Sequence, residues 1–286
     1  MKPFYIHVGY GKTATTWLQD KLFPQHPQIR YWGKTSSEYT KELEWLKNLH
    51  YHDDYQYFKE REKLKHWILS RHFEDSAKVS LLSSEAFTNF TMIVSQANRI
   101  KDVFPNPRII VALRNPIALL ESYYKQNVKG GLWFLNIEEY LDWRRTPFAI
   151  QKRPPVYLPD LFYDEVVGFY KSVFGSENLC VLRHEDFVIA PNSLASKLGS
   201  FMGIDFGDIS EIAKEKVLEG LPNELVPAQR IKNLQNYLSE SFPDLAKHVE
   251  THVRLFDLRE KPIIGHALAQ RLTEYFKPKC SMYFCD

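Results

Sequence analysis

The sequence predicts an α/β protein in which a central parallel sheet is flanked by helices. Four short runs of apolar residues recur along the chain, and each is followed at once by glycine, serine or arginine. Helical patterns separate these runs, as expected for parallel strands that are buried on both faces of a sheet. The first run leads through a loop with two glycines into a helix. The four runs cover residues 4–8, 79–82, 108–113 and 179–182.

Length and composition fit this fold class. A chain of 286 residues can still be built around a single hydrophobic core, so we expect one domain over residues 1–286. The hydrophobic fraction of 44% and the charged fraction of 25% are typical of a folded globular protein. The net charge of +2 excludes the strong positive field of a dedicated nucleic-acid binder and favours a small anionic ligand.

Cysteine usage and the N-terminal residues bear on the compartment. The chain has three cysteines and no C-x-x-C pattern, which argues against a disulfide framework and against a structural zinc site. It shows no charged start followed by an apolar segment, and no apolar run of about 18 residues. We therefore expect a cytoplasmic protein without a secretory signal or a transmembrane segment.

The loop after the first apolar run, residues 9–16, is predicted to bind a phosphate-like anion. Its residues 11–13, Gly-Lys-Thr, match the last three positions of the nucleotide-binding pattern G-x-x-x-x-G-K-[ST]. Ile6 occupies the position where that pattern has its first glycine. A strand, this loop and a helix in succession bring backbone N–H groups, the Lys12 ammonium and the positive helix end to one point. The alternative is a chance GKT in a turn. Further hydroxyl donors belong to Thr13, Thr15 and Thr16.

The residues that follow the next two runs indicate how this anion is neutralised. Magnesium in nucleoside triphosphatases is held partly by an acidic residue that ends a strand. Glu85 is offset from that position by two serines, and the third run is followed by Arg114. Because a cation site does not place arginine there, we expect protein cations, and no metal, to balance the charge of the ligand.

Two stretches resemble sulfotransferases that use 3'-phosphoadenosine 5'-phosphosulfate (PAPS). "YGKTATTWL" resembles their 5'-phosphosulfate loop, and "RIIVALRNPIALLESYY" resembles their 3'-phosphate motif, an arginine after a strand with a serine eight residues later. Weaker similarities lie in "SLLSSEAF", "LCVLRHEDF" and "LPNELVPAQRIKN", and the chain is similar to bacterial and carbohydrate sulfotransferases above all. The resemblance implies a P-loop-like three-layer fold whose loop wraps a phosphosulfate and needs no full triphosphate cradle.

The same resemblance implies which residues bind the donor. Lys12 is expected to bridge the 5'-phosphate and the leaving oxygen of the sulfonate, and Arg114 and Ser122 to hold the 3'-phosphate. Trp17 is expected either to stack on adenine or to pack in the core. Ala14 replaces the usual loop glycine, and we expect it to keep a negative φ. The implied set is Gly11, Lys12, Thr13, Ala14, Thr15, Thr16, Trp17, Arg114, Ser122 and Arg230.

Transfer to a hydroxyl needs a base that takes the proton of the acceptor. Besides Lys12, the catalytic residue we expect first is Glu85, because the family keeps a catalytic His or Glu at this strand end; the alternative is a capping or Arg-paired glutamate. His7, inside the first strand, is the second candidate, with a hydrogen-bonded packing residue as the alternative. His184 and Glu185 are expected to support the sheet or to contact the nucleotide indirectly.

The sequence departs from the cytosolic enzymes of this family near its end. Their Arg-Lys-Gly segment, which closes over the cofactor, is missing. Its charge is expected to come from Arg230 with Lys232, or from Lys277 with Lys279. Two stretches, at about 34–75 and 126–163, are expected to form helical insertions that cap the acceptor site. In the second, Arg144, Arg145, Lys152 and Arg153 form either a contact for an anionic glycan or a solvated face.

The leading hypothesis is a PAPS-dependent sulfotransferase that moves a sulfuryl group to a hydroxyl of a saccharide, a glycolipid or a small molecule. The transfer is an in-line displacement that leaves adenosine 3',5'-bisphosphate. Two alternatives are a P-loop small-molecule kinase, which requires magnesium-dependent ATP binding, and a non-catalytic adenine-nucleotide-binding module. The module predicts an apolar residue at position 85, where the chain has glutamate. No nucleic-acid partner is expected.

Overall fold

The computed structural model describes residues 3–33, 53–73, 78–88, 93–141, 158–215, 220–241 and 263–284. Internal contacts divide the chain into two compact units. The first comprises Met1–Asn115 and Tyr163–Leu218, and the second comprises Pro116–Phe162 and Glu219–Asp286. The described elements of the first unit are strands and helices, and those of the second unit are helices. The single domain that the sequence suggests stays a prediction.

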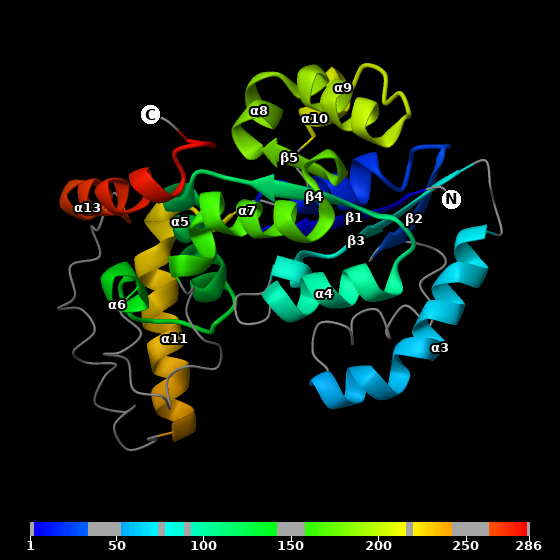
Figure 1. The fold of residues 1–286 in the computed structure, drawn as a ribbon. Helices are drawn as coiled ribbons and strands as arrows, with labels where there is room; N and C mark the ends of the chain where they lie inside the picture. Colours follow the sequence, from blue (N-terminus) through cyan, green and yellow to red (C-terminus); the bar gives the residue numbers. More distant parts are fainter. Residues whose placement is uncertain are drawn as a thin grey trace. The chain divides into compact units, whose positions relative to one another are not determined.

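A parallel sheet forms the centre of the first unit (Figure 1). Its order is β2-β3-β1-β4-β5, so the carboxyl end of β1 lies between those of β3 and β4. This confirms the predicted parallel fold and adds β2, an edge strand that pairs only with β3 in the described sheet. The strands are β1 (Phe4–Gly9), β2 (Ile29–Gly33), β3 (Val79–Ser83), β4 (Pro107–Leu113) and β5 (Leu179–Arg183).

One face of the sheet is covered by the helical segment after the first loop and by α9 (Pro191–Met202). The predicted helix from Thr15 consists of α1 (Thr15–Trp17) and the π-helical η1 (Leu18–Leu22). Its apolar side chains pack with Tyr5 of β1 and with the apolar side of α9. Two short helices complete this side, α8 (His184–Ile189) and α10 (Ser210–Ala213).

The opposite face of the sheet is covered by α4 (Ile93–Val103) and α7 (Tyr163–Phe174), and α3 (Asp54–Phe73) packs on α4 (Figure 1). Phe4 alternates with Tyr5 along β1, and its ring meets Phe104 at a centroid distance of 4.8 Å. Buried Arg99 of α4 donates to a carboxylate oxygen of Asp54 at 2.7 Å, which ties α3 to this layer. Two 3-10 turns are η2 (Glu85–Thr88) and η6 (Ser176–Asn178).

The second unit packs α5 (Pro116–Lys129) against α11 (Val226–Ser241) and α13 (His266–Phe276). Buried Asn233 of α11 donates to the carbonyl oxygens of Val128 and Trp133 at 2.7 and 2.8 Å, and so fixes the chain beyond α5. The remaining elements are α6 (Ile137–Leu141), η5 (Leu158–Leu161), η7 (Asn223–Leu225) and η9 (Lys277–Lys279).

The two expected insertions are described only in part. Asp54–Phe73 of the first form a helix, as predicted, whereas residues 34–52 and 74–77 lie outside the described residues. In the second, residues 142–157 lie outside the described residues. That stretch holds the predicted glycan contacts Arg144, Arg145, Lys152 and Arg153. The acceptor cap therefore stays a prediction.

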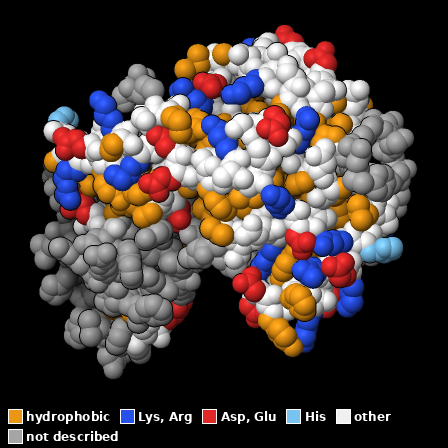
Figure 2. Space-filling view, viewed as in Figure 1, with side chains coloured by type: hydrophobic (Ala, Val, Ile, Leu, Met, Phe, Trp, Pro, Cys, Tyr) orange, Lys and Arg blue, Asp and Glu red, His pale blue; other side chains and the backbone are white. Residues whose placement is uncertain are grey.

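The surface and the helices bear on possible partners. Figure 2 shows Lys and Arg side chains interspersed with Asp and Glu on the visible face, in keeping with the net charge of +2. Within the described ranges, every helix is too short or too polar to cross a lipid bilayer. Cys180 and Cys280 are both buried.

Candidate active site

The loop after β1 is held by hydrogen bonds to its neighbours. The Tyr10 N–H donates to the carbonyl oxygen of Ala112 in β4 at 2.7 Å. The Thr13 hydroxyl, on a side chain only 2% exposed, donates to the carbonyl oxygen of Tyr10 at 2.5 Å. This hydrogen bond joins two residues of the same loop. It uses the hydroxyl proton of Thr13, which the sequence predicts to be a donor to the ligand.

Two non-glycine residues of this loop have left-handed backbone conformations. The φ angle is 66° at Lys12 and 64° at Ala14. The predicted negative φ at Ala14 is therefore wrong. Left-handed Ala14 directly precedes Thr15, the first residue of α1. A left-handed residue followed by a right-handed one turns successive N–H groups into a concavity that suits an anion, and this requirement overrides the preference of alanine.

Arg114 follows β4 directly, and its side chain reaches the loop. Its Nη1 donates to the carbonyl oxygen of Lys12 at 3.0 Å, although the two residues are 102 positions apart. Both side chains are half-buried. The residues predicted to bind the 5'-phosphate and the 3'-phosphate are therefore neighbours in the folded chain.

Glu85 opens η2 just beyond the end of β3, and its backbone lies against the start of the loop. A Cβ added to Gly9, where φ is 107°, would stand 3.3 Å from the Cα of Glu85 and 2.6 Å from the Oγ1 of Thr88. Glycine is required there for both reasons. The Thr88 hydroxyl in turn donates to the carbonyl oxygen of Glu85 at 3.1 Å. The half-buried Glu85, which we predict as the base, therefore lies next to the first residue of the loop.

His7 lies inside β1 and is fully buried. Its Nδ1 is 2.7 Å from the Oγ of Ser83, which also accepts a hydrogen bond from Nε2 of Gln19 at 3.0 Å. The ring meets Phe23 edge-on. Burial lowers the pKa of His7 from 6.5 to about 4, so the imidazole is neutral at physiological pH. These surroundings are those expected for the alternative role of His7, a hydrogen-bonded packing residue.

Trp17 and the two threonines before it start the helix. Trp17 is 4% exposed, its indole N–H donates to the carbonyl oxygen of Ile212 at 2.9 Å, and its ring centroid lies 4.6 Å from that of Phe187. These contacts are those of a core residue, the second of the two expected roles. Thr15 is buried, whereas Thr16 is half-buried.

The other predicted ligands lie in the second unit. Ser122 is half-buried on α5. Arg230 lies on α11, where its Nε donates to the carbonyl oxygen of Phe134 at 3.0 Å. Lys232 lies on the same helix, and Lys277 and Lys279 belong to η9. The roles of these residues stay predictions.

Two side chains hold the peptide group that follows Arg114. The Tyr163 hydroxyl donates to the carbonyl oxygen of Arg114 at 2.9 Å, and Oε1 of Glu185 accepts the N–H of Asn115 at 2.8 Å. Burial and the charge of Arg114 lower the pKa of neighbouring His184, while Glu185 acts in the opposite direction. The sequence carries no signal for Tyr163, whereas it predicts that Glu185 supports the sheet or contacts the nucleotide indirectly.

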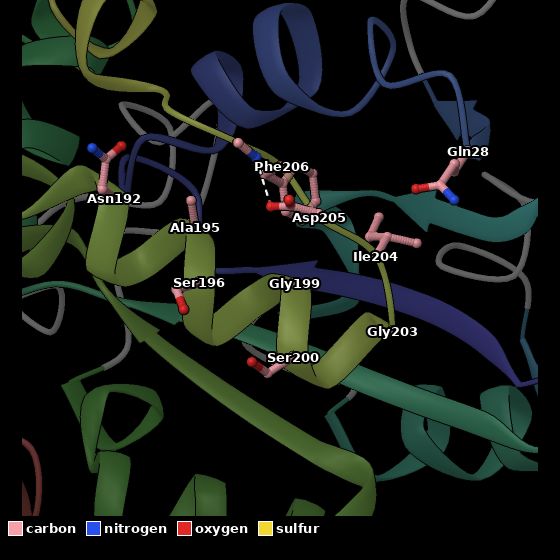
Figure 3. Close-up of a pocket in the computed structure, with 11 residues that line it drawn as sticks. Gln28, Asn192, Ala195, Ser196, Gly199, Ser200, Gly203, Ile204, Asp205 and Phe206 are labelled. Carbon is pink, nitrogen blue, oxygen red and sulfur yellow. Dashed lines mark hydrogen bonds between the residues drawn. The ribbon is translucent and has the colours of Figure 1, made fainter.

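A shallow pocket of about 560 Å³ lies elsewhere in the first unit, over α9 and the turn that follows it (Figure 3). Ser196, Ser200 and Asp205 contribute polar atoms to its wall, and Asp205 accepts the N–H of Gly207 at 2.9 Å. None of the predicted site residues lines it. Within the described residues, no group of three or more His, Cys, Asp or Glu side chains is placed to hold a metal ion.

The fold is that of a P-loop-like protein whose loop, Glu85 and Arg114 follow the carboxyl ends of its central strands. The model of the sulfotransferase family matches residues 3–208, which include the loop, Glu85 and Arg114. The chain belongs to the sulfotransferase family and is a PAPS-dependent sulfotransferase. Among curated proteins, none matches the sequence.

Solved structures of sulfotransferases are similar to the chain to different degrees. A sulfotransferase from Alicyclobacillus acidocaldarius is 18% identical, with a TM-score of 0.51 over 89% of this chain and 99% of that one. The sulfotransferase domain of the Synechococcus PCC 7002 olefin synthase is 15% identical, with a TM-score of 0.44 over 90% and 95%. A mouse sulfotransferase complexed with PAP is 14% identical, with a TM-score of 0.42 over 98% and 85%.

Proposed function

We propose that the chain transfers the sulfuryl group of PAPS to a hydroxyl of a saccharide, a glycolipid or a small-molecule acceptor. One observation supports this most directly. The guanidinium of Arg114 donates to the backbone carbonyl oxygen of Lys12, so the Arg114 side chain lies against the loop that we propose to hold the adenine nucleotide. Membership of the family favours this function over the kinase and over the non-catalytic module.

The loop is proposed to hold the 5'-phosphosulfate. The concavity formed at Ala14 and Thr15 presents backbone N–H groups, and Lys12 adds a full positive charge. Charge accumulates on the bridging oxygen as the S–O bond breaks, so a lysine placed there stabilises the transition state more than the bound donor. The half-buried position of Lys12 strengthens this effect because little water screens it.

Arg114 is proposed to bind the 3'-phosphate together with Ser122. A guanidinium offers planar N–H donors that match two phosphate oxygens at once. Its position directly after a buried strand, with a hydrogen bond to the loop, limits the freedom that it loses when the nucleotide binds. Arg230 with Lys232, or Lys277 with Lys279, complete the charge around this phosphate in the proposal.

The reaction is proposed to be a single in-line displacement. The acceptor oxygen forms a bond to sulfur while the bond from sulfur to the 5'-phosphate oxygen breaks, and that oxygen keeps the electron pair. The carboxylate of Glu85 takes the proton of the acceptor hydroxyl. The products are the sulfated acceptor and adenosine 3',5'-bisphosphate.

Calorimetry tests the donor site without an acceptor. Adenosine 3',5'-bisphosphate and ATP are titrated into the protein in EDTA and again in magnesium. We expect tight binding of the bisphosphate in both buffers and weak binding of ATP. Tight ATP binding that depends on magnesium would contradict the proposal and would favour the kinase.

A second experiment tests the base. Labelled PAPS is first screened against glycans, glycolipids and small hydroxyl compounds. Turnover of the best acceptor is then compared for the wild type, Glu85→Gln, and Glu211→Gln as a control at an exposed carboxylate of α10. We expect Glu85→Gln to lose at least about a hundredfold in kcat while it keeps its affinity for the bisphosphate. Full activity of Glu85→Gln would refute the assignment of the base.

The cytoplasm is the proposed compartment. Cys180 is a buried free thiol, and burial raises its pKa to about 11. Such thiols fit a reducing environment. Localisation of a tagged full-length chain by fractionation tests this proposal, and recovery in the secreted fraction would contradict it.

A further inference from the structure

The peptide group between Arg114 and Asn115 is held at both ends. Its carbonyl oxygen accepts the Tyr163 hydroxyl at 2.9 Å, and its N–H donates to Oε1 of Glu185 at 2.8 Å. Tyr163 is fully buried at the start of α7, and Glu185 lies in the first turn of α8. Two helices, which begin at Tyr163 and at His184, thus fix a single peptide plane beyond the end of β4.

This plane determines where the Arg114 side chain points. The strand fixes the backbone before the Cα atom of Arg114, and the held peptide fixes the backbone after it, so the Cα–Cβ direction is set from both sides. The next residue is Pro116, which has no N–H and restricts the conformation of Asn115. The residue after Asn115 thus offers no backbone donor of its own.

The hydrogen bond from the Asn115 N–H to Glu185 is also long-range, since it joins residues 70 positions apart that follow the neighbouring strands β4 and β5. Asp186, the adjacent carboxylate on α8, instead faces Arg183 at 3.7 Å and lies half-exposed. The two acidic residues of this turn therefore differ in what they hold. Only the first bonds to the backbone next to Arg114 in the described part of the chain.

We propose that Glu185 and Tyr163 are positioning residues that aim Arg114 at the 3'-phosphate and so determine the preference for 3'-phosphorylated adenine nucleotides. This inference rests on the proposed function. Glu185 acts here as a hydrogen-bond acceptor, not through its charge. Removing the acceptor should therefore weaken binding of the 3'-phosphate and leave binding of the 5'-phosphate unchanged.

The test measures the affinity ratio between adenosine 3',5'-bisphosphate and adenosine 5'-phosphate by calorimetry. The variants are Glu185→Ala, Glu185→Gln and Tyr163→Phe, with Asp186→Ala as the matched control and Arg114→Ala as the reference. We expect Glu185→Ala and Tyr163→Phe to lower the ratio about tenfold, the equivalent of one hydrogen bond. Glu185→Gln keeps an acceptor oxygen and should stay within about twofold of the wild type, as should Asp186→Ala.

The outcomes separate this inference from the proposed function. If the wild type shows no preference, or Arg114→Ala does not lower it, the proposed function fails. If Arg114→Ala lowers the ratio and Glu185→Ala does not, only the inference is wrong. Equal losses in Glu185→Gln and Glu185→Ala would show that charge is what matters and would overturn it too. If Glu185→Ala does not fold, an unchanged affinity ratio in Tyr163→Phe would show that the inference is wrong.

Discussion

Replacing His7 by glutamine removes a buried titratable group from the middle of the sheet, and the structure predicts how stability then depends on pH. His7 is fully buried, and its neighbours Ser83, Gln19 and Phe23 are uncharged. Burial lowers its pKa from 6.5 to about 4 because a charged imidazole loses its hydration there. The unfolded chain exposes His7 and restores the ordinary value.

The sign follows from proton binding. Between pH 6.5 and about 4 the unfolded chain binds a proton at His7 and the folded chain does not, so the free energy of unfolding falls as the pH falls. The contribution is fully present above pH 6.5 and is lost by about pH 4. The difference corresponds to about 3 kcal/mol over the whole range, and to about 2 kcal/mol between pH 7.5 and pH 5.

Urea denaturation at pH 7.5 and pH 5 measures this difference. We expect the wild type to lose about 2 kcal/mol more than His7→Gln between the two conditions. His184, whose pKa is also lowered, contributes to both proteins and cancels in the comparison. Leu22→Val, a buried apolar change in η1, is the control and should keep the pH dependence of the wild type. Equal losses in the wild type and in His7→Gln would refute the reasoning.

Three further changes probe the loop and its helix. Gly9→Ala places a methyl group 2.6 Å from Thr88 at a φ of 107°, so urea denaturation should show a loss of about 1–3 kcal/mol. Ala14→Gly removes the strain of a left-handed alanine but raises the conformational entropy of the unfolded chain. Thermal unfolding should therefore show a free energy of unfolding that is unchanged or higher by up to about 1 kcal/mol. Trp17→Phe removes the bond to Ile212 and should cost about 1 kcal/mol while affinity for adenosine 3',5'-bisphosphate stays within about twofold, whereas a large loss of affinity would show adenine stacking.

The strands differ in how far the sequence predicts them. β1, β3, β4 and β5 are confirmed, since strands buried in a parallel sheet read as nearly continuous apolar runs. β2 was not predicted. Its residues alternate apolar and polar at the start, with Arg30 reaching the carbonyl oxygen of Arg71 at 2.6 Å, and an edge strand with one neighbour carries a weaker pattern. The sequence predicts the helix after the loop, but its π-helical second half has no sequence signal.

The sequence predicts those parts of the site whose residues directly follow a strand. The anion loop and Arg114 follow apolar strands directly, and parallel strands end at one edge of a sheet, so their proximity follows from topology. The bond from Thr13 back to Tyr10 and the left-handed Ala14 depend on how the loop closes, which composition does not encode. The bond between Glu185 and Asn115 joins residues 70 positions apart and needs the packed fold to be seen.

The loop keeps its costly backbone because its neighbours hold it. Two left-handed residues, Lys12 and Ala14, oppose folding by roughly 2–4 kcal/mol together. Three hydrogen bonds offset this, from Tyr10 to Ala112, from Thr13 to Tyr10 and from Arg114 to Lys12, and together they contribute roughly 3 kcal/mol. The bond of Arg114 belongs both to this balance and to the proposed phosphate site. A nucleotide that draws the guanidinium away would therefore loosen the loop, unless Nη1 keeps Lys12 while the other N–H groups take the phosphate. Because the held Arg114–Asn115 peptide fixes the base of the side chain, we expect the second arrangement.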